Sequence, residues 1–127
     1  MLSRPWALTT TPLTYDPPLT DPKELAKVQD LEPERPDLIR CWRPVEPARR
    51  LVTLSRFPVL ILVSEASYHA GCDHCTARYL SQAGVKTDFV RLADLGLHGD
   101  GHMLMLEKHS AEIAAEIGRW LDGRKLD

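Results

Sequence analysis

The residues best suited to chemistry lie close together at positions 97–102, which read Leu-His-Gly-Asp-Gly-His. Two histidines and two glycines in one short segment make poor core material, because glycine lets the backbone turn tightly and approach another group closely. An imidazole can take up a proton near neutral pH and give it back, which is the work of a general base and acid. His102 is therefore the leading candidate for a functional residue. We expect His98 to hold the same loop by a hydrogen bond.

The pattern around these histidines predicts a loop at the end of a strand. The unbroken apolar run from Phe57 to Val63 predicts a strand buried on both faces, and Thr87 to Leu92 predicts a second strand. Between them, apolar residues at helical spacing predict a helix that Asp73 caps and Gly84 ends. A last amphipathic helix is expected from Ser110 to Leu121.

The order strand, helix, strand, loop, helix is typical of an α/β fold. It implies a right-handed crossover and two adjacent parallel strands, with the His102 loop at their carboxyl ends. Ligands of such folds bind outside the carboxyl ends of the strands. The loop that carries His102 is therefore expected where α/β proteins build their sites.

The first 56 residues have a different character, since all ten prolines lie at or before position 58. We predict an irregular Pro-rich segment with short helices, one capped by Asp21 and one over Pro47–Leu51. Trp6, Tyr15 and Trp42 make the segment too apolar for a disordered spacer, so it is expected to be ordered, with these side chains buried. The predicted organisation is residues 1–56 as this segment and 57–127 as the regular part.

Composition excludes several classes of partner. A formal net charge of −2 and a pI near 6.2 give no electrostatic case for nucleic acid or an anionic membrane. The longest apolar run, Phe57–Val63, is far shorter than the roughly 20 residues that cross a bilayer. Three cysteines and the lack of a visible signal peptide predict a cytoplasmic protein without a disulfide scaffold. No cofactor is indicated.

At residues 96–105 and the helix after them, the chain resembles the end of the α/β-hydrolase superfamily. The resemblance is to a divergent bacterial and fungal esterase branch, in which a second histidine and a methionine-rich run flank the catalytic histidine. Trp6–Pro18 and Glu65–His69 also resemble that branch. The resemblance implies a partial α/β-hydrolase fold made of the last two parallel strands with their connecting and closing helices. It also implies that His102 is the catalytic histidine of a serine esterase.

The nucleophile of that family sits in a G-x-S-x-G elbow upstream of the histidine. The six serines here, none of which has that context, are Ser3, Ser55, Ser64, Ser67, Ser81 and Ser110. The acid is expected upstream of this chain, with Glu65 or Asp73 as substitutes within it. The resemblance therefore predicts the carboxyl-terminal part of a hydrolase for small carboxylic esters, inactive alone. Its partner is an amino-terminal half or a second copy. If the chain were active alone, Ser64, Ser67 or Cys72 would be the candidate nucleophiles.

Two alternatives remain open at this point. A buried strand followed by Cys72-Asp73-His74-Cys75 and a helix is also the arrangement of thioredoxin-like dithiol proteins, although no later proline supplies their cis-proline. Zinc held by Cys72, Cys75 and His69 or His74 lacks the usual fourth ligand, so no metal is expected. A noncatalytic remnant or subunit is the other alternative.

Two further expectations concern the carboxyl-terminal part. His109 is expected to be solvent-exposed near the start of the last helix. The run Met103–Leu106 is expected to pack in the core, as methionine-rich runs usually do.

Overall fold

The computed structural model describes residues 4–124. These residues form two compact units, one of residues 4–61 and 71–89 and the other of residues 62–70 and 90–124. Each unit is described by itself below. The predicted division at residue 56 stays a prediction.

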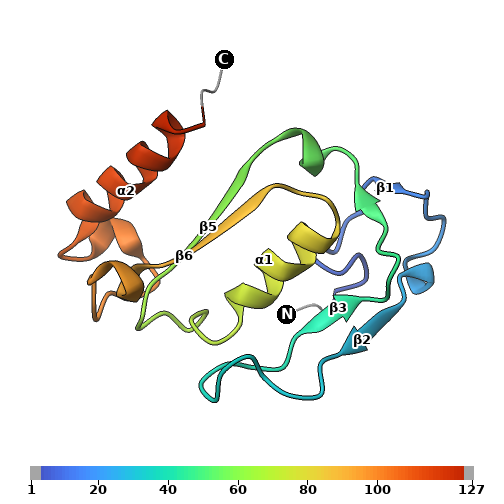
Figure 1. Cartoon of the computed structure of the whole chain (residues 1–127), viewed down its shortest axis with the longest axis horizontal. Coiled ribbons are helices and arrows are strands. Elements are labelled where there is room, and N and C mark those ends of the chain that lie inside the picture. The colour runs from blue at the N-terminus through green and yellow to red at the C-terminus, as the bar shows by residue number, and fades with distance from the viewer. Residues whose placement is uncertain (1–3, 125–127) are drawn as a thin grey trace. The chain divides into compact units, whose positions relative to one another are not determined.

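A pair of parallel strands makes the chain compatible with a partial α/β fold. Strand β5 (Val59–Val63) pairs with β6 (Thr87–Arg91) in a two-stranded sheet, and the two lie side by side in Figure 1. Where they start, the Val59 amide donates to the Lys86 carbonyl at 2.9 Å. The expectation of a strand buried on both faces is wrong, because only Val63 of β5 is buried. Each strand has one neighbour among the described residues, so the other edge of each is unpaired.

Helix α1 (Asp73–Gln82) begins one residue earlier than predicted, since Cys72 and not Asp73 occupies its N-cap position. Its buried face carries Cys75, Tyr79 and Leu80. The helix ends at Gln82 with Ala83 as its C-cap, and Gly84 follows with φ of 82°, a left-handed conformation that glycine adopts without strain. The predicted stop is therefore confirmed.

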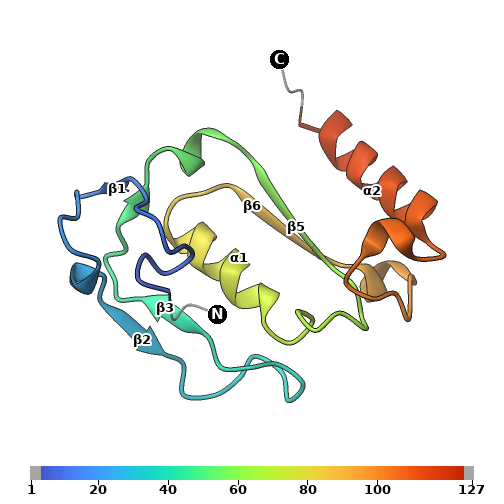
Figure 2. The same ribbon diagram turned by 180° about the vertical axis from the view of Figure 1, so that it is seen from behind.

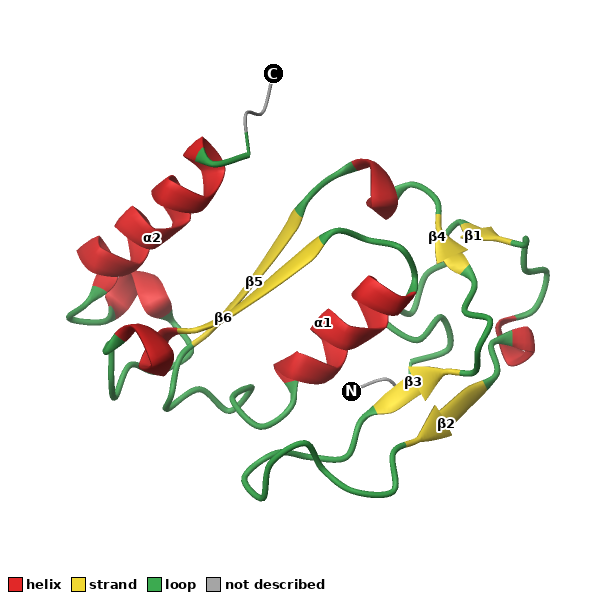
Figure 3. Ribbon diagram, viewed as in Figure 1, coloured by secondary structure: helices red, strands yellow, loops and turns green. Residues whose placement is uncertain are grey.

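The amino-terminal segment contains strands that were not predicted. As Figure 3 shows, β1 (Tyr15–Asp16) lies beside β4 (Arg50–Leu51), and these two strands pair antiparallel. Strands β2 (Lys27–Gln29) and β3 (Trp42–Pro44) form a second antiparallel pair, visible from behind in Figure 2. Short 3₁₀ helices span Pro22–Glu24 and Leu54–Arg56.

The predicted short helices have opposite outcomes. Asp21 caps the 3₁₀ helix in a capping box with Glu24, so the first is confirmed. The helix expected over Pro47–Leu51 is wrong. Leu51 is buried and pairs with Tyr15, so burial of this leucine in an antiparallel pair overrides the weak helical signal.

The core of the first unit joins the amino-terminal segment to α1, which confirms that this segment is ordered. Tyr15 and Tyr79 are buried with their hydroxyl oxygens 3.1 Å apart, and burial raises the pKa of both phenols. Trp6 packs against this core from a partly buried position. Trp42 is 44% exposed, so its expected burial is wrong.

A disulfide joins Cys41, which precedes β3, to Cys75 in the first turn of α1. The expectation that the chain lacks a disulfide, which rested on its three cysteines, is therefore wrong. Two of the three are bonded to each other, and Cys72 is the third.

The second unit holds the loop after β5, a 3₁₀ helix at Leu92–Leu95, another at Leu104–Leu106, and helix α2 (Ser110–Asp122). Ile113 is the buried anchor of α2. The expected burial of Met103–Leu106 is wrong, since Met105 is 69% and Leu106 78% exposed. None of the helices among residues 4–124 has the length and apolar character needed to cross a membrane.

Candidate functional site

Two loops of the second unit are tied together where the parallel strands end. One follows β5 and contains residues 64–70, and the other follows β6 and contains residues 96–109. The Ser64 hydroxyl donates to the Gly101 carbonyl at 2.6 Å, and the Ala66 amide donates to the Asp100 carbonyl at 3.0 Å. These bonds fix the backbone on both sides of the turn that leads to His102.

His102 is held through one nitrogen of its ring. Its Nδ1 lies 2.9 Å from the Oγ of Ser67, and the backbone amide of His69 donates to the same Oγ at 3.0 Å. Ser67 is 8% exposed. A hydroxyl oxygen has two lone pairs, so Ser67 can accept from His69 and from an Nδ1–H of His102 together. In that tautomer the Nε2 of His102 carries the lone pair that a general base needs.

Aromatic rings pack on the His102 imidazole. The rings of Tyr68 and His69 lie with their centroids 4.5 Å and 4.8 Å from that of His102. Together with the Ser67 bond, these contacts restrict rotation of the imidazole, which is what positions a proton-transfer group.

Glu65, one of the two substitute acids, is paired with another histidine. Glu65 accepts from the Nδ1 of His98 at 2.5 Å, so His98 holds the loop as expected and Glu65 is its partner. Asp73 lies in the first turn of α1, in the other unit. Within residues 4–124, the recorded side-chain hydrogen bond of His102 goes to a hydroxyl and not to a carboxylate.

A second imidazole is paired with a buried acid, which the sequence did not reveal. Asp100 is 1% exposed, and the Nδ1 of His109 lies 2.8 Å and 3.0 Å from its two carboxylate oxygens. The expectation that His109 is a solvent-exposed residue is wrong, because this buried charge needs a partner. Nothing in the spacing of Asp100 and His109 marks them as a pair.

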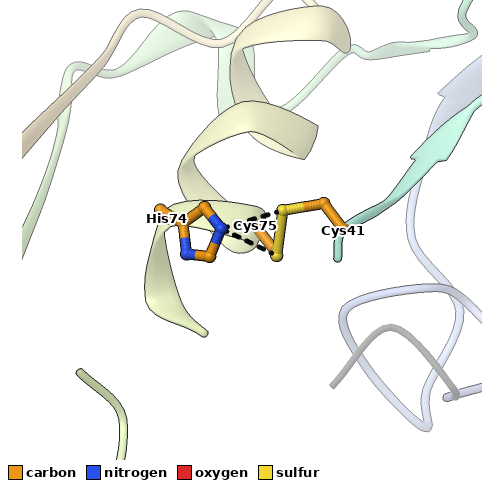
Figure 4. A group of neighbouring side chains, drawn as sticks. All are labelled: Cys41, His74 and Cys75. Carbon is orange, nitrogen blue, oxygen red and sulfur yellow. Dashed lines mark hydrogen bonds between the residues drawn. A yellow bond between two sulfur atoms is a disulfide. The ribbon is translucent and has the colours of Figure 1, made fainter. Parts of the chain in front are cut away.

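The dithiol hypothesis is wrong. Cys75 is bonded to Cys41, so Cys72 and Cys75 do not form a redox pair. Burial, with the nearby Asp73 carboxylate, raises the pKa of the Cys72 thiol, which disfavours a reactive thiolate. In the oxidised chain the same bond also keeps Cys75 from binding zinc together with Cys72. The group that does come together is Cys41, His74 and Cys75 (Figure 4).

Comparison with curated proteins finds a relative. Over 119 residues the chain is 34% identical to a probable secreted lipase, phiG, of Fungal sp. (strain ATCC 74256). The match covers 94% of this chain and 33% of the relative, so the chain spans about a third of the relative's length. No family model matches the chain, and no solved structure matches it significantly.

The relative also corrects the expected location. A cytoplasmic protein was predicted, but the relative is named as a secreted protein, which points outside the cell. The Cys41–Cys75 disulfide agrees with that correction, since such bonds persist in oxidising compartments. The comparison supports a lipase-like or esterase-like relationship for this chain.

Proposed function

We propose that this chain is the carboxyl-terminal part of a serine-esterase-like α/β-hydrolase and that His102 is its catalytic histidine. The observation that carries the proposal is the hydrogen bond of Ser67 to Nδ1 of His102, at the end of parallel strand β6. When Nδ1–H of His102 is the donor in this bond, Nε2 is the basic atom of the imidazole. The similarity to a probable secreted lipase supports the reaction class and an extracellular location.

In the proposed reaction, Nε2 of His102 takes the proton from a serine hydroxyl supplied by a part of the protein outside this chain. The resulting imidazolium then gives the proton to the leaving alcohol of a carboxylic ester. Nucleophile, acid and oxyanion donors belong to that outside part.

Ser67 is a positioning residue in this scheme. It accepts the Nδ1–H of His102 and keeps its own hydroxyl proton, which it can donate onward. A carboxylate in the outside part that accepts this proton would be coupled to the imidazole through Ser67. The acid of the triad would then stabilise the imidazolium indirectly, through the Ser67 hydroxyl.

The test is a chimera in which this chain replaces the aligned third of the fungal lipase, assayed on a short-chain aryl ester. His102→Ala is expected to lower kcat by about 10⁴-fold or more, as loss of a catalytic histidine does. His98→Ala, in the same loop, is the matched control and should keep most of the activity. A His102→Ala chimera as active as the parent would contradict the proposal, as would a folded parent chimera that hydrolyses no ester.

One observation favours a second assignment for the catalytic histidine. The Asp100–His109 pair has a carboxylate at Nδ1, which is the partner that a triad histidine usually has. His109→Asn in the same chimera separates the two. A loss of activity with His109→Asn and not with His102→Ala would transfer the catalytic role to His109.

A measurement on the 127-residue chain itself does not depend on the chimera. The ¹⁵N chemical shifts of neutral His102 report which ring nitrogen carries the proton. The proposal requires the proton on Nδ1. A proton on Nε2 would leave no lone pair there and would exclude His102 as a base at that atom.

A further inference from the structure

Three side chains that the proposed hydrolase does not use meet in the core of the first unit. The Nε2 of His74 lies 3.2 Å from the Sγ of Cys41 and 3.5 Å from the Sγ of Cys75. Dashed lines mark these two contacts in Figure 4. All three residues are at least 97% buried. A nitrogen and two sulfurs that converge in a water-poor interior are the atoms that bind a borderline-soft cation.

The two sides of this cluster are held together without the disulfide. Cys41 lies next to β3, and His74 and Cys75 lie in the first turn of α1. Asp30 accepts from Arg43 of β3 at 2.8 Å and from Arg78 of α1 at 2.8 Å. The Ile39 amide also donates to the Gly71 carbonyl at 3.0 Å. Breaking the sulfur–sulfur bond therefore leaves the three side chains close to one another.

The distances from the His74 nitrogen to the two sulfurs suit tetrahedral zinc, and the sulfurs themselves must separate once their bond is broken. With Zn–S near 2.3 Å and Zn–N near 2.0 Å, neighbouring ligand atoms of a tetrahedron lie about 3.4 to 3.8 Å apart. The two distances from His74 Nε2 already lie close to this range. Cys75 is also in the first turn of a ten-residue helix, where the helix dipole favours the thiolate that a metal needs.

We propose that the reduced chain binds one Zn²⁺ through Cys41, His74 and Cys75, and that ion and disulfide are mutually exclusive occupants of this site. Reduction by a water-soluble phosphine breaks the bond between the sulfurs. The phosphine supplies two electrons and takes an oxygen from water, whose two protons go to the thiols. Zn²⁺ then displaces both thiol protons without changing its oxidation state, and a water completes four ligands. Oxidised glutathione reverses the outcome: it accepts two electrons from the two thiolates and two protons from the solvent, becomes two thiols, and leaves a disulfide that releases the ion.

This site would keep Cys41 and Cys75 from pairing with Cys72 before the chain is oxidised. Cys72 lies only three residues before Cys75 and is the cysteine that the Cys41–Cys75 disulfide leaves out. A wrong pair of Cys72 with either of the others would remove the bond between α1 and the segment before β3.

The experiment is a titration of the phosphine-reduced 127-residue chain with Cd²⁺, a spectroscopic stand-in for Zn²⁺, followed by competition with Zn²⁺. We expect sulfur-to-cadmium charge-transfer absorption that saturates at one ion per chain, disappears when Zn²⁺ is added, and is absent in the oxidised chain. Cys41→Ser should weaken binding at least 100-fold, whereas Cys72→Ser, the matched control, should leave it unchanged.

Two further variants distinguish the loss of a metal ligand from the loss of the folded structure. His74→Gln removes the nitrogen and keeps both thiols, and we expect about a tenfold to 100-fold loss of affinity. Asp30→Asn weakens the link between α1 and β3, and a smaller loss is expected with the same absorption spectrum. No saturable absorption in a reduced chain with native circular dichroism would overturn the proposal. Binding that requires Cys72, or that is unaffected by Cys41→Ser and His74→Gln, would also overturn it.

Discussion

Ser67 occupies the position beside His102 Nδ1 where hydrolases of the resembled family hold a carboxylate. A neutral hydroxyl stabilises the charged imidazolium less than a carboxylate does. It restrains the ring orientation, but because it can donate or accept it does not fix the tautomer as a carboxylate would. The Oγ is itself fixed by the His69 amide, and the Tyr68 and His69 rings pack on the imidazole. The geometry therefore favours orientation as the role of Ser67.

Ser67→Ala in the chimera is predicted to lower kcat about tenfold, the equivalent of one hydrogen bond of roughly 1.4 kcal/mol. KM should change little, because Ser67 acts through His102 and is not proposed to touch the ester. Ser67→Thr should restore most of kcat. An effect confined to KM, or no rescue by threonine, would contradict the positioning role.

Asp100→Ala is predicted to destabilise the folded chain by about 2 kcal/mol, because it leaves the His109 ring without its charged partner. Asp100 is 1% exposed, and its carboxylate links the His102 loop to the residue that precedes α2. Urea unfolding measures the difference. Glu112→Ala, on the exposed part of α2, is the control and should change stability by less than about 0.5 kcal/mol. If both substitutions changed the free energy of unfolding equally, the Asp100–His109 pair would not be a specific source of stability.

The long elements could be predicted from sequence and the short ones could not. The regions of β5, β6, α1 and α2 each present several apolar positions at strand or helix spacing, and each formed close to its expected bounds. Strands β1 to β4 are two or three residues long, too short for any periodic signal. They form because distant segments of the first unit meet in three dimensions.

In the candidate site, too, some features could be predicted from the sequence and others could not. His102 stood out because of its glycine-rich loop at the end of a strand. Its contact with Ser67 spans 35 residues of sequence, and the Asp100–His109 and Cys41–Cys75 pairs depend on how loops and helices meet. Burial of Met103–Leu106 was expected from apolarity alone, yet apolar residues also remain on surfaces.

Asp30 links the β2–β3 pair to α1, so its charge should appear in the pH dependence of stability. Partial burial opposes ionisation, but the Arg43 and Arg78 guanidinium groups outweigh it and hold the pKa of Asp30 below its usual value. A carboxyl group with a depressed folded pKa adds stability above its unfolded pKa, near 3.9 for aspartate, and loses it as pH falls through the folded value.

Asp30→Asn is therefore predicted to cost about 1 to 2 kcal/mol of unfolding free energy at pH 7 and progressively less below about pH 4. Denaturant titrations at several pH values measure the difference between the two chains. Asp37→Asn is a suitable control, since the Arg35–Asp37 ion pair is exposed. A cost that is the same at pH 7 and at pH 2 would contradict the assignment.

At the scale of the whole molecule, the chain matches about a third of the length of a probable secreted lipase. Large apolar side chains of the described residues remain on the surface, with Phe57 58% and Tyr68 77% exposed. Apolar side chains that are exposed singly are common on protein surfaces, so these two residues do not by themselves mark an interface.

The 127-residue chain alone is predicted to hydrolyse a short-chain aryl ester no faster than an equal concentration of free imidazole. Triad groups act as a unit, and a positioned histidine without nucleophile and oxyanion donors is only a weak base catalyst. The rate is measured beside the His102→Ala chain. A rate well above imidazole that is abolished by both His102→Ala and Ser67→Ala would contradict this expectation. It would then identify Ser67 as a nucleophile.

The most direct test of the account is a crystal structure of the chimera after reaction with a fluorophosphonate, which marks the nucleophilic serine of a hydrolase. The account predicts that Nε2 of His102 lies about 2.6 to 3.2 Å from the oxygen of the modified serine, with Ser67 still bonded to Nδ1. A modified serine that has His109 beside it, or neither histidine within hydrogen-bond reach, would contradict the account.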